Sequence, residues 1–213
     1  FLVPTYMPQA GLGKDLAFRH SLKIDSYDMY CGYSSSFVAV DISKAIEAFV
    51  LLFNSPELRI KMGKSGLERA KKLFDWKQIL RQYQHLWSNL KDIRLKSHSI
   101  LSQPTIYPSR LDPFHAFSHY PTEILSLNHV LSLVDDNFEN AQKRYNNYMK
   151  LAMVKYAELV CPTCEEIDII FQTLHLSDTT SNDIINLFSS SRRLYIFRSL
   201  CWLMKLNLIK ILR

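Results

Sequence analysis

The chain has 213 residues, of which 47% are hydrophobic and 22% are charged, as is ordinary for a folded globular protein. Its net charge is +6 and only 5 residues are glycine, which argues against a glycine-rich phosphate loop and a complete doubly wound sheet. Four cysteines are too few for a disulfide scaffold at this length, and no apolar run reaches the roughly 18 residues of a membrane-spanning helix.

The first 36 residues predict a short strand and a long connection. The apolar run FLVPT at 1–5 predicts a buried strand, whose backbone groups need neighbours on both sides. We therefore expect the chain to be the C-terminal piece of a longer protein. Residues 6–36 predict a packed, aromatic-rich loop punctuated by Pro8, Gly11 and Gly13, with room for a short helix from Lys14 to Leu22.

Three helices are predicted between Asp41 and Leu90. Asp41 is suited to cap the first helix, Ser55 the second, with Pro56 at its first position, and Asp75 the third. Apolar residues recur on one face of the first helix. The second has a basic outer face and two glycines, which we expect to permit close approach of another backbone. The third carries a large apolar face that includes Trp76, Ile79, Leu80, Tyr83, Leu86, Trp87 and Leu90.

The remaining chain predicts a linker and a small helical domain. Four prolines in 96–123 exclude a long helix there, so this segment is the expected domain boundary. A helix is predicted over 136–159, and others after the capping box of Thr163 and Glu166, after Ser181 and after Ser191. Asn207 is a candidate C-cap before a last strand, LIKIL. This order has the proportions of a helix-turn-helix or winged-helix unit.

The spacing of motifs between Asp41 and Leu90 resembles the C-terminal helices of GT-B glycosyltransferases of family 4. The resemblance is carried jointly by a helix opened by an Asp, by P-E-L-R followed by M-G-x-x-G, and by F-D-W with a later Tyr. The matching residues are Asp41, Pro56, Glu57, Leu58, Arg59, Gly63, Gly66, Trp76 and Tyr83. FLVPT is similar to the strand that precedes these helices in the family, and 6–36 is then an insertion after that strand.

This resemblance implies a mainly α chain that contains the remnant of a Rossmann-like C-terminal domain over 1–95. After the linker at 96–123 we expect a small helical domain of unknown role over 124–213, with the winged-helix-like proportions noted above. It implies a retaining enzyme that transfers a sugar from a nucleotide-sugar donor to an acceptor. The family's E-x7-E donor site lies before Phe1, so no catalytic or cofactor-binding residue is assigned in this chain, which we expect to be inactive alone. The resemblance also implies that the third helix crosses to the missing N-terminal portion of the polypeptide.

Other motifs favour structural roles. Cys161 and Cys164 form a lone C-x-x-C, for which His175 is a candidate third ligand, and His115 and His119 lie between two prolines. A structural zinc site needs four ligands, so no metal site is predicted and no cofactor is expected in this chain.

Basic residues allow two further interpretations. Arg192, Arg193 and Arg198 are suited to contact phosphates in a DNA reader, but residues 98–213 carry equal numbers of basic and acidic side chains, which argues against nucleic acid. The last helix also has the composition of an interfacial membrane helix. We expect a cytoplasmic protein, and contact with a membrane surface remains an open alternative. The alternative to the transferase fragment is a non-enzymatic helical module that docks on a protein or a membrane surface.

Overall fold

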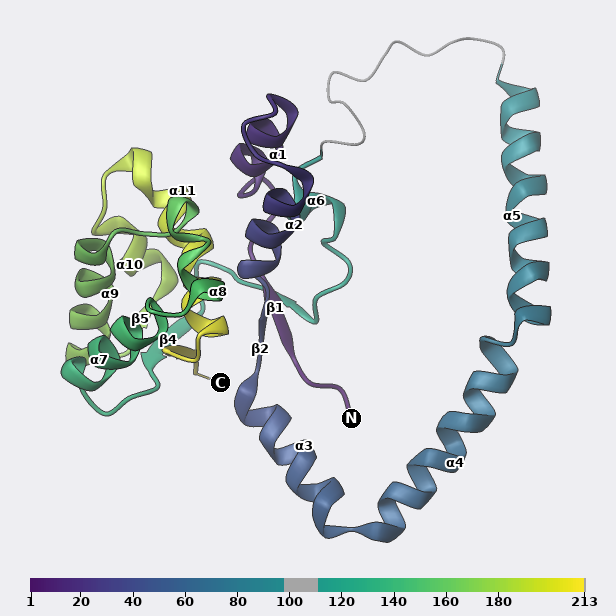
Figure 1. Cartoon of the computed structure of the whole chain (residues 1–213), viewed down its shortest axis with the longest axis horizontal. Coiled ribbons are helices and arrows are strands. Elements are labelled where there is room, and N and C mark those ends of the chain that lie inside the picture. Colours follow the sequence, from purple (N-terminus) through teal and green to yellow (C-terminus); the bar gives the residue numbers. More distant parts are fainter. Residues whose placement is uncertain (98–110, 213) are drawn as a thin grey trace. The chain divides into compact units, whose positions relative to one another are not determined.

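The computed structural model describes residues 1–97 and 111–212, and these are mainly helical, as the sequence predicts (Figure 1). They divide into two compact units: residues 1–45 with 111–212 form unit one, and residues 46–97 form unit two. This division differs from the predicted boundaries at 95 and 124, because segments on both sides of unit two fold together in unit one.

Unit one contains a small sheet built around the first strand. β1 (Thr5–Met7) pairs antiparallel with β2 (Ala39–Val40) and parallel with β3 (Glu123–Ile124), in the order β2-β1-β3. The strand predicted at 1–5 therefore begins four residues later than expected. Leu2 is 97% exposed and so lies outside the core, whereas Tyr6 and Met7 are buried.

The predicted loop at 6–36 contains two helices, α1 (Lys14–Ser21) and α2 (Tyr27–Ser36). The prediction of a loop was wrong for α2, because the hydroxyls of its serines donate hydrogen bonds to carbonyls of the same helix. Ser34 donates to the carbonyl of Tyr30, and Ser36 donates to that of Gly32. Gly32 is needed for packing, because a Cβ there would lie 1.7 Å from the hydroxyl of Tyr156.

Part of the predicted linker is ordered structure in unit one. Residues 98–110 of the predicted linker lie outside the described residues. After them, α6 (Pro113–Ala116) brings Phe114 into the core, where its ring meets Phe37 edge-on at 6.1 Å between centroids. β3 then completes the first sheet. The prolines were interpreted as a surface linker, whereas Pro113 begins a helix at a position that suits its missing amide.

The second sheet of unit one is surrounded by the C-terminal helices. β4 (Val130–Leu133) lies between β5 (Thr179–Thr180) and β6 (Ile209–Ile211), antiparallel to both. The helices are α7 (Phe138–Tyr148), α8 (Ala152–Lys155), the 3-10 helix η2 (Glu158–Val160), α9 (Cys164–Leu176), α10 (Ser181–Asn186) and α11 (Ser190–Lys205). Their apolar side chains, including Ile167, Phe171, Leu200 and Trp202, form one continuous core with those of α1, α2 and β1.

The predicted helix ends in this region are partly confirmed. Thr163 and Glu166 form the expected capping box. The caps predicted at Ser181 and Ser191 are instead Thr180 and Ser189. The single helix predicted over 136–159 is divided into α7, α8 and η2. A left-handed residue at Asn207 (φ 55°) follows α11, and the predicted final strand is β6.

Unit two consists of the helical segment predicted from the sequence. It contains α3 (Ile42–Asn54), whose first turn belongs to unit one, α4 (Pro56–Leu73) and α5 (Trp76–Lys96) (Figure 1). All three helices begin directly after the predicted caps. None of the described residues from 46 to 97 is buried, so these helices hold few apolar contacts among themselves.

Candidate functional site

Most residues of the family motif lie at or beside the starts of the three helices, whereas Gly63 and Gly66 lie within α4 and Tyr83 lies within α5. Asp41 precedes α3 and accepts a hydrogen bond of 3.0 Å from the amide of Lys44. Pro56, Glu57 and Leu58 form the first turn of α4, where the amide of Leu58 donates to the hydroxyl of Ser55 at 3.2 Å. These contacts satisfy amides that a helix leaves without partners at its N-terminus.

Arg59 connects α4 to the end of α3. One nitrogen of its guanidinium donates to the carbonyls of Leu52 and Phe53, at 2.5 and 2.8 Å. These carbonyls belong to the last turn of α3, which lacks helical donors and carries partial negative charge. An open hollow of about 570 Å³ lies at this turn and is lined mainly by apolar side chains. Arg59 in the P-E-L-R motif therefore fixes the turn between two helices.

The two motif glycines do not meet another backbone. No heavy atom among the described residues lies within 4 Å of a Cβ built at Gly63 or Gly66. The expectation of a close helix contact at these positions is therefore wrong for the described part of the chain. Both glycines face open space on α4.

The aromatic motif residues on α5 are exposed. Asp75 caps this helix by accepting from the amide of Lys77 at 2.8 Å. Trp76 is 72% exposed and Tyr83 is 48% exposed. The ring of Tyr83 lies 5.9 Å from that of Trp87, which is 60% exposed. The motif residues of α5 thus form a surface and not a core.

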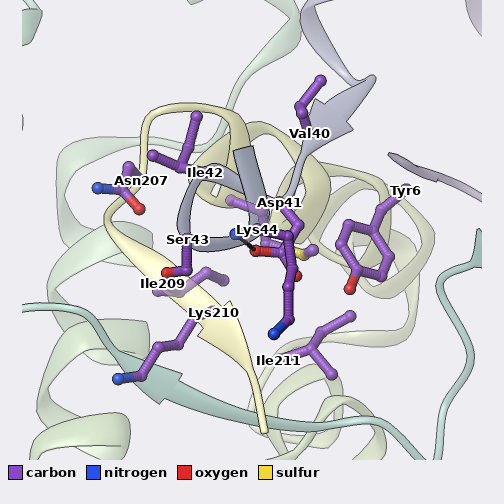
Figure 2. Close-up of a pocket in the computed structure, with 11 residues that line it drawn as sticks. Tyr6, Val40, Asp41, Ile42, Ser43, Lys44, Asn207, Ile209, Lys210 and Ile211 are labelled. Carbon is purple, nitrogen blue, oxygen red and sulfur yellow. Dashed lines mark hydrogen bonds between the residues drawn. The ribbon is translucent and has the colours of Figure 1, made fainter. Parts of the chain in front are cut away.

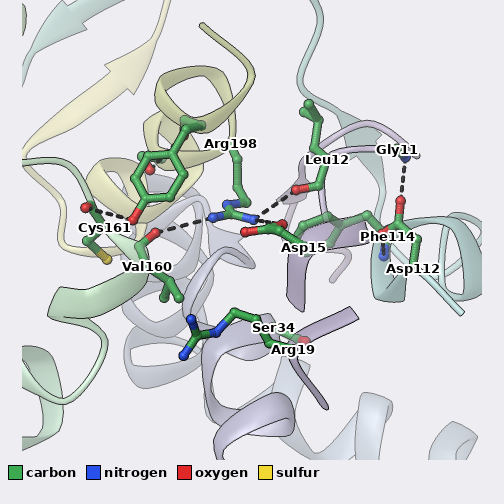
Figure 3. A network of polar contacts seen from close by, with 12 residues as sticks. Gly11, Leu12, Asp15, Arg19, Ser34, Asp112, Phe114, Val160, Cys161 and Arg198 are labelled. Atoms are coloured by element: carbon green, nitrogen blue, oxygen red, sulfur yellow. Dashed lines mark hydrogen bonds and ion pairs between the residues drawn. The ribbon is translucent and has the colours of Figure 1, made fainter. Parts of the chain in front are cut away.

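A buried arginine forms the most extensive polar contact of unit one (Figure 3). The guanidinium of Arg198 pairs with Asp15 at 2.5 Å and donates to the carbonyls of Leu12 and Val160, at 3.0 and 3.4 Å. It also lies over the rings of Phe37 and Tyr195, at 4.7 and 4.8 Å. Arg198 is 1% exposed, and its Nε has no hydrogen-bond partner among the described residues.

Asp112 makes a second connection near this centre. Its carboxylate accepts one hydrogen bond from the amide of Gly11 and another, at 2.9 Å, from the amide of Phe114 (Figure 3). The bond from Phe114 makes Asp112 the N-cap of α6. Together with Arg198, it ties the segment after β1 to chain regions more than a hundred positions away. The sequence analysis did not single out Asp15 or Asp112. One signal in the sequence indicated such partners. Arg198 stands among apolar residues of a predicted helix, and a buried charge of this kind requires a partner.

A small pocket lies beside the start of α3 (Figure 2). Its volume is about 180 Å³, and its lining includes Tyr6, Asp41, Lys44, Asn207 and Lys210. Asp41 is already engaged as the helix cap. The lining contains no cysteine or histidine.

The candidate metal and redox residues do not form a cluster. Cys161 is buried and Cys164 is exposed, and both are free thiols. Burial raises the pKa of the Cys161 thiol to about 12, which keeps it protonated at neutral pH. Within residues 1–97 and 111–212, no three side chains of the metal-binding types, including His115, His119 and His175, come together as ligands.

The three arginines considered for DNA binding are engaged within the protein. Arg192 forms a bidentate pair with Glu166, with both bonds at 2.7 Å, and Arg193 donates to the carbonyl of Phe188. Arg198 is buried, as described above. Every residue from Ile196 to Met204 on α11 is also buried, so this part of α11 is a core helix. It is available neither to a DNA groove nor to a membrane surface.

The chain was compared with known proteins. No family model, curated protein or solved structure matches it. The functional interpretation therefore depends on the motif spacing and on the geometry described above.

None of the described helices combines the length and apolar character that crossing a membrane would require.

Proposed function

We propose that the chain is part of a retaining GT-B glycosyltransferase that moves a sugar from a nucleotide-sugar donor to an acceptor. The supporting observation is the agreement between the motif and the helix geometry. Asp41, Ser55 and Asp75 each accept an amide hydrogen bond at the first turn of a helix. The family pattern that this chain resembles contains three motif elements in the same order as these helix starts.

Arg59 adds support because its position in the motif has a physical role. Its bonds to the carbonyls of Leu52 and Phe53 fix the α3–α4 turn.

In this proposal the chain supplies the closing elements of the enzyme. The helices α3, α4 and α5 are the remnant of a Rossmann-like nucleotide-sugar domain, whereas β1 folds together with residues 111–212 in unit one. The donor-binding Glu pair of the family is not assigned to any residue of this chain. The described residues are therefore assigned a structural part in the enzyme, and sugar transfer is assigned to the longer polypeptide.

The test compares the polypeptide as its genome encodes it with the chain 1–213. We expect calorimetry to detect binding of a uridine- or guanosine-diphosphate sugar by the encoded polypeptide and none by the isolated chain. An upstream reading frame without a Glu pair spaced E-x7-E, together with no binding of any nucleotide-sugar, would overturn the proposal.

A second candidate is a non-enzymatic helical module that docks on a partner. The observation that favours it is the exposure of apolar side chains on unit two, where Phe49 is 73% and Phe53 is 83% exposed. The same calorimetric experiment separates the two candidates, because a docking module has no affinity for nucleotide-sugars.

A further inference from the structure

The net charge of the chain is carried by one segment. Residues 46–97 contain 11 Lys and Arg against 5 Asp and Glu, and all other residues contain 15 of each. Unit two therefore accounts for the whole formal charge of +6, while the rest of the chain is neutral. A segment with this excess attracts anionic surfaces, and the attraction weakens as salt increases.

The same segment exposes an apolar stripe on α5. Spacings of three and four residues place large side chains on one face of this helix. Trp76, Trp87 and Ile93 are 72%, 60% and 65% exposed. The stripe includes a shallow hollow of about 230 Å³ lined by Ile79, Gln82, Tyr83 and Leu86. We define the α5 stripe as Trp76, Ile79, Leu80, Tyr83, Leu86, Trp87, Leu90 and Ile93.

Basic side chains flank the α5 stripe. Lys77, Arg81 and Lys91 follow the stripe residues at positions that a helix of 3.6 residues per turn places along one border of the stripe. Arg94 and Lys96 extend the charge at the C-terminal end of the helix. Within α5 the only acidic residue is Asp92. The helix thus combines a tryptophan-containing apolar face with a basic border.

The lysines and the net positive charge around this stripe favour an anionic lipid surface over a protein partner. In unit one, apolar faces meet one another in a core that contains one buried basic side chain, Arg198, paired with Asp15. An apolar protein interface is likewise depleted of lysine at its centre. Tryptophan and tyrosine rings beside Lys and Arg instead match the headgroup region of a bilayer, where the rings enter the interface and the cations meet anionic lipid.

We propose that α5 docks on an anionic phospholipid bilayer, with its stripe in the headgroup region and Lys77, Arg81 and Lys91 on the lipid phosphates. The helix lies along the surface, in keeping with the absence of a membrane-crossing helix among the described residues. This inference goes beyond the proposed transferase and can be tested without a donor sugar. It gives α5 an anionic lipid surface in place of the N-terminal portion that the family resemblance implies for this helix.

The test is co-sedimentation of the chain with vesicles of phosphatidylcholine alone or of phosphatidylcholine mixed with phosphatidylglycerol. We expect binding to the mixed vesicles only, and release by high salt. The triple variant K77E/R81E/K91E should weaken binding on the order of a hundredfold, because each basic residue contributes about 1 kcal/mol at such a surface. The variant W76S/W87S should also lose binding.

The matched control reverses charge outside the stripe. Lys150 and Lys155 are exposed on unit one, and K150E/K155E should retain binding to the mixed vesicles. Circular dichroism checks that all variants keep their helices. A wild-type measurement needs no variant: brominated lipid should quench the fluorescence of Trp76 and Trp87, since Trp202 is buried in the core.

Three results would overturn the proposal. The first is equal binding to both kinds of vesicle. The second is a loss of binding in K150E/K155E as large as that in K77E/R81E/K91E, and the third is the absence of quenching by brominated lipid. Self-association of the chain that depends on Trp76 and Trp87 without lipid binding would assign the stripe to a second copy of the chain instead.

Discussion

At the scale of single residues, Arg198 is the contact on which the packing of unit one most depends. Replacing it in R198M removes the donors to the carbonyls of Leu12 and Val160 and the ion pair with Asp15. We expect a loss of about 3 kcal/mol in the free energy of unfolding, since buried acceptors would be left without partners. Urea unfolding followed by circular dichroism measures this.

Two comparison variants separate what the ion pair of Arg198 contributes to stability from what its packing contributes. The side chain of Asp15 is 47% exposed, so D15N should cost less than R198M, about 1 kcal/mol. K155M changes an exposed side chain and should change stability by less than about 0.5 kcal/mol. Equal unfolding midpoints for R198M and K155M would show that the buried network does not stabilise the protein.

Glu166 gives unit one a pH dependence with a defined sign. Its hydrogen bonds to Arg192 lower the pKa of the Glu166 carboxyl. The pair therefore contributes fully above the unfolded-state pKa of about 4.3 and is lost as pH falls toward the folded-state value. The variant E166Q can still complete the capping box with Thr163. We expect it to be less stable than wild type by about 1 kcal/mol at neutral pH.

The measurement is the urea midpoint of both proteins at neutral pH and in steps below about pH 4.3. The difference between wild type and E166Q should shrink as the pH falls, because protonated Glu166 no longer pairs with Arg192 as an anion. A difference that stays constant across this range would contradict the assigned role of the pair.

At the scale of elements, the helices that could be predicted are those with a signal in their own local sequence. The helices after Asp41, Ser55 and Asp75 could be predicted because each has a side-chain cap and an apolar stripe. The helix α2 was missed because its serines and Gly32 suggest a loop, and their compensation by hydrogen bonds within the helix is visible only in three dimensions. The break after Tyr148 was also missed, although Asn146 and Asn147 lower helix propensity there.

The α3–α4 turn offers a prediction at this scale. R59K keeps the charge but replaces the planar guanidinium, which reaches the carbonyls of both Leu52 and Phe53. We expect the last turn of α3 to fray, with amide hydrogen exchange about twofold faster, since the ammonium group loses one of the two hydrogen bonds, which contributes roughly 0.5 kcal/mol. Nuclear magnetic resonance can measure this exchange. K64M on the same helix is the control, and an equal change in it would argue against the Arg59 contact.

At the scale of the whole molecule, the features that could not be predicted are contacts between residues far apart in the sequence. Asp15 and Arg198 are 183 positions apart, and no local pattern indicates that they meet. For the same reason the predicted boundary at 96–123 did not anticipate that α6 and β3 join the segment after β1. The helix caps at Asp41, Ser55 and Asp75 could be predicted from the sequence, whereas the open space beside the glycines of α4 could not.

The central claim concerns unit two. Its helices are formed but have no buried face among the described residues, and α5 binds an anionic membrane surface. Hydrogen exchange followed by mass spectrometry, with and without anionic vesicles, tests this most directly. We predict slow exchange in α9 and α11, fast exchange in α5 without vesicles, and strong protection of α5 when phosphatidylglycerol vesicles are added. Slow exchange of α5 in the absence of vesicles, unchanged by their addition, would contradict the account.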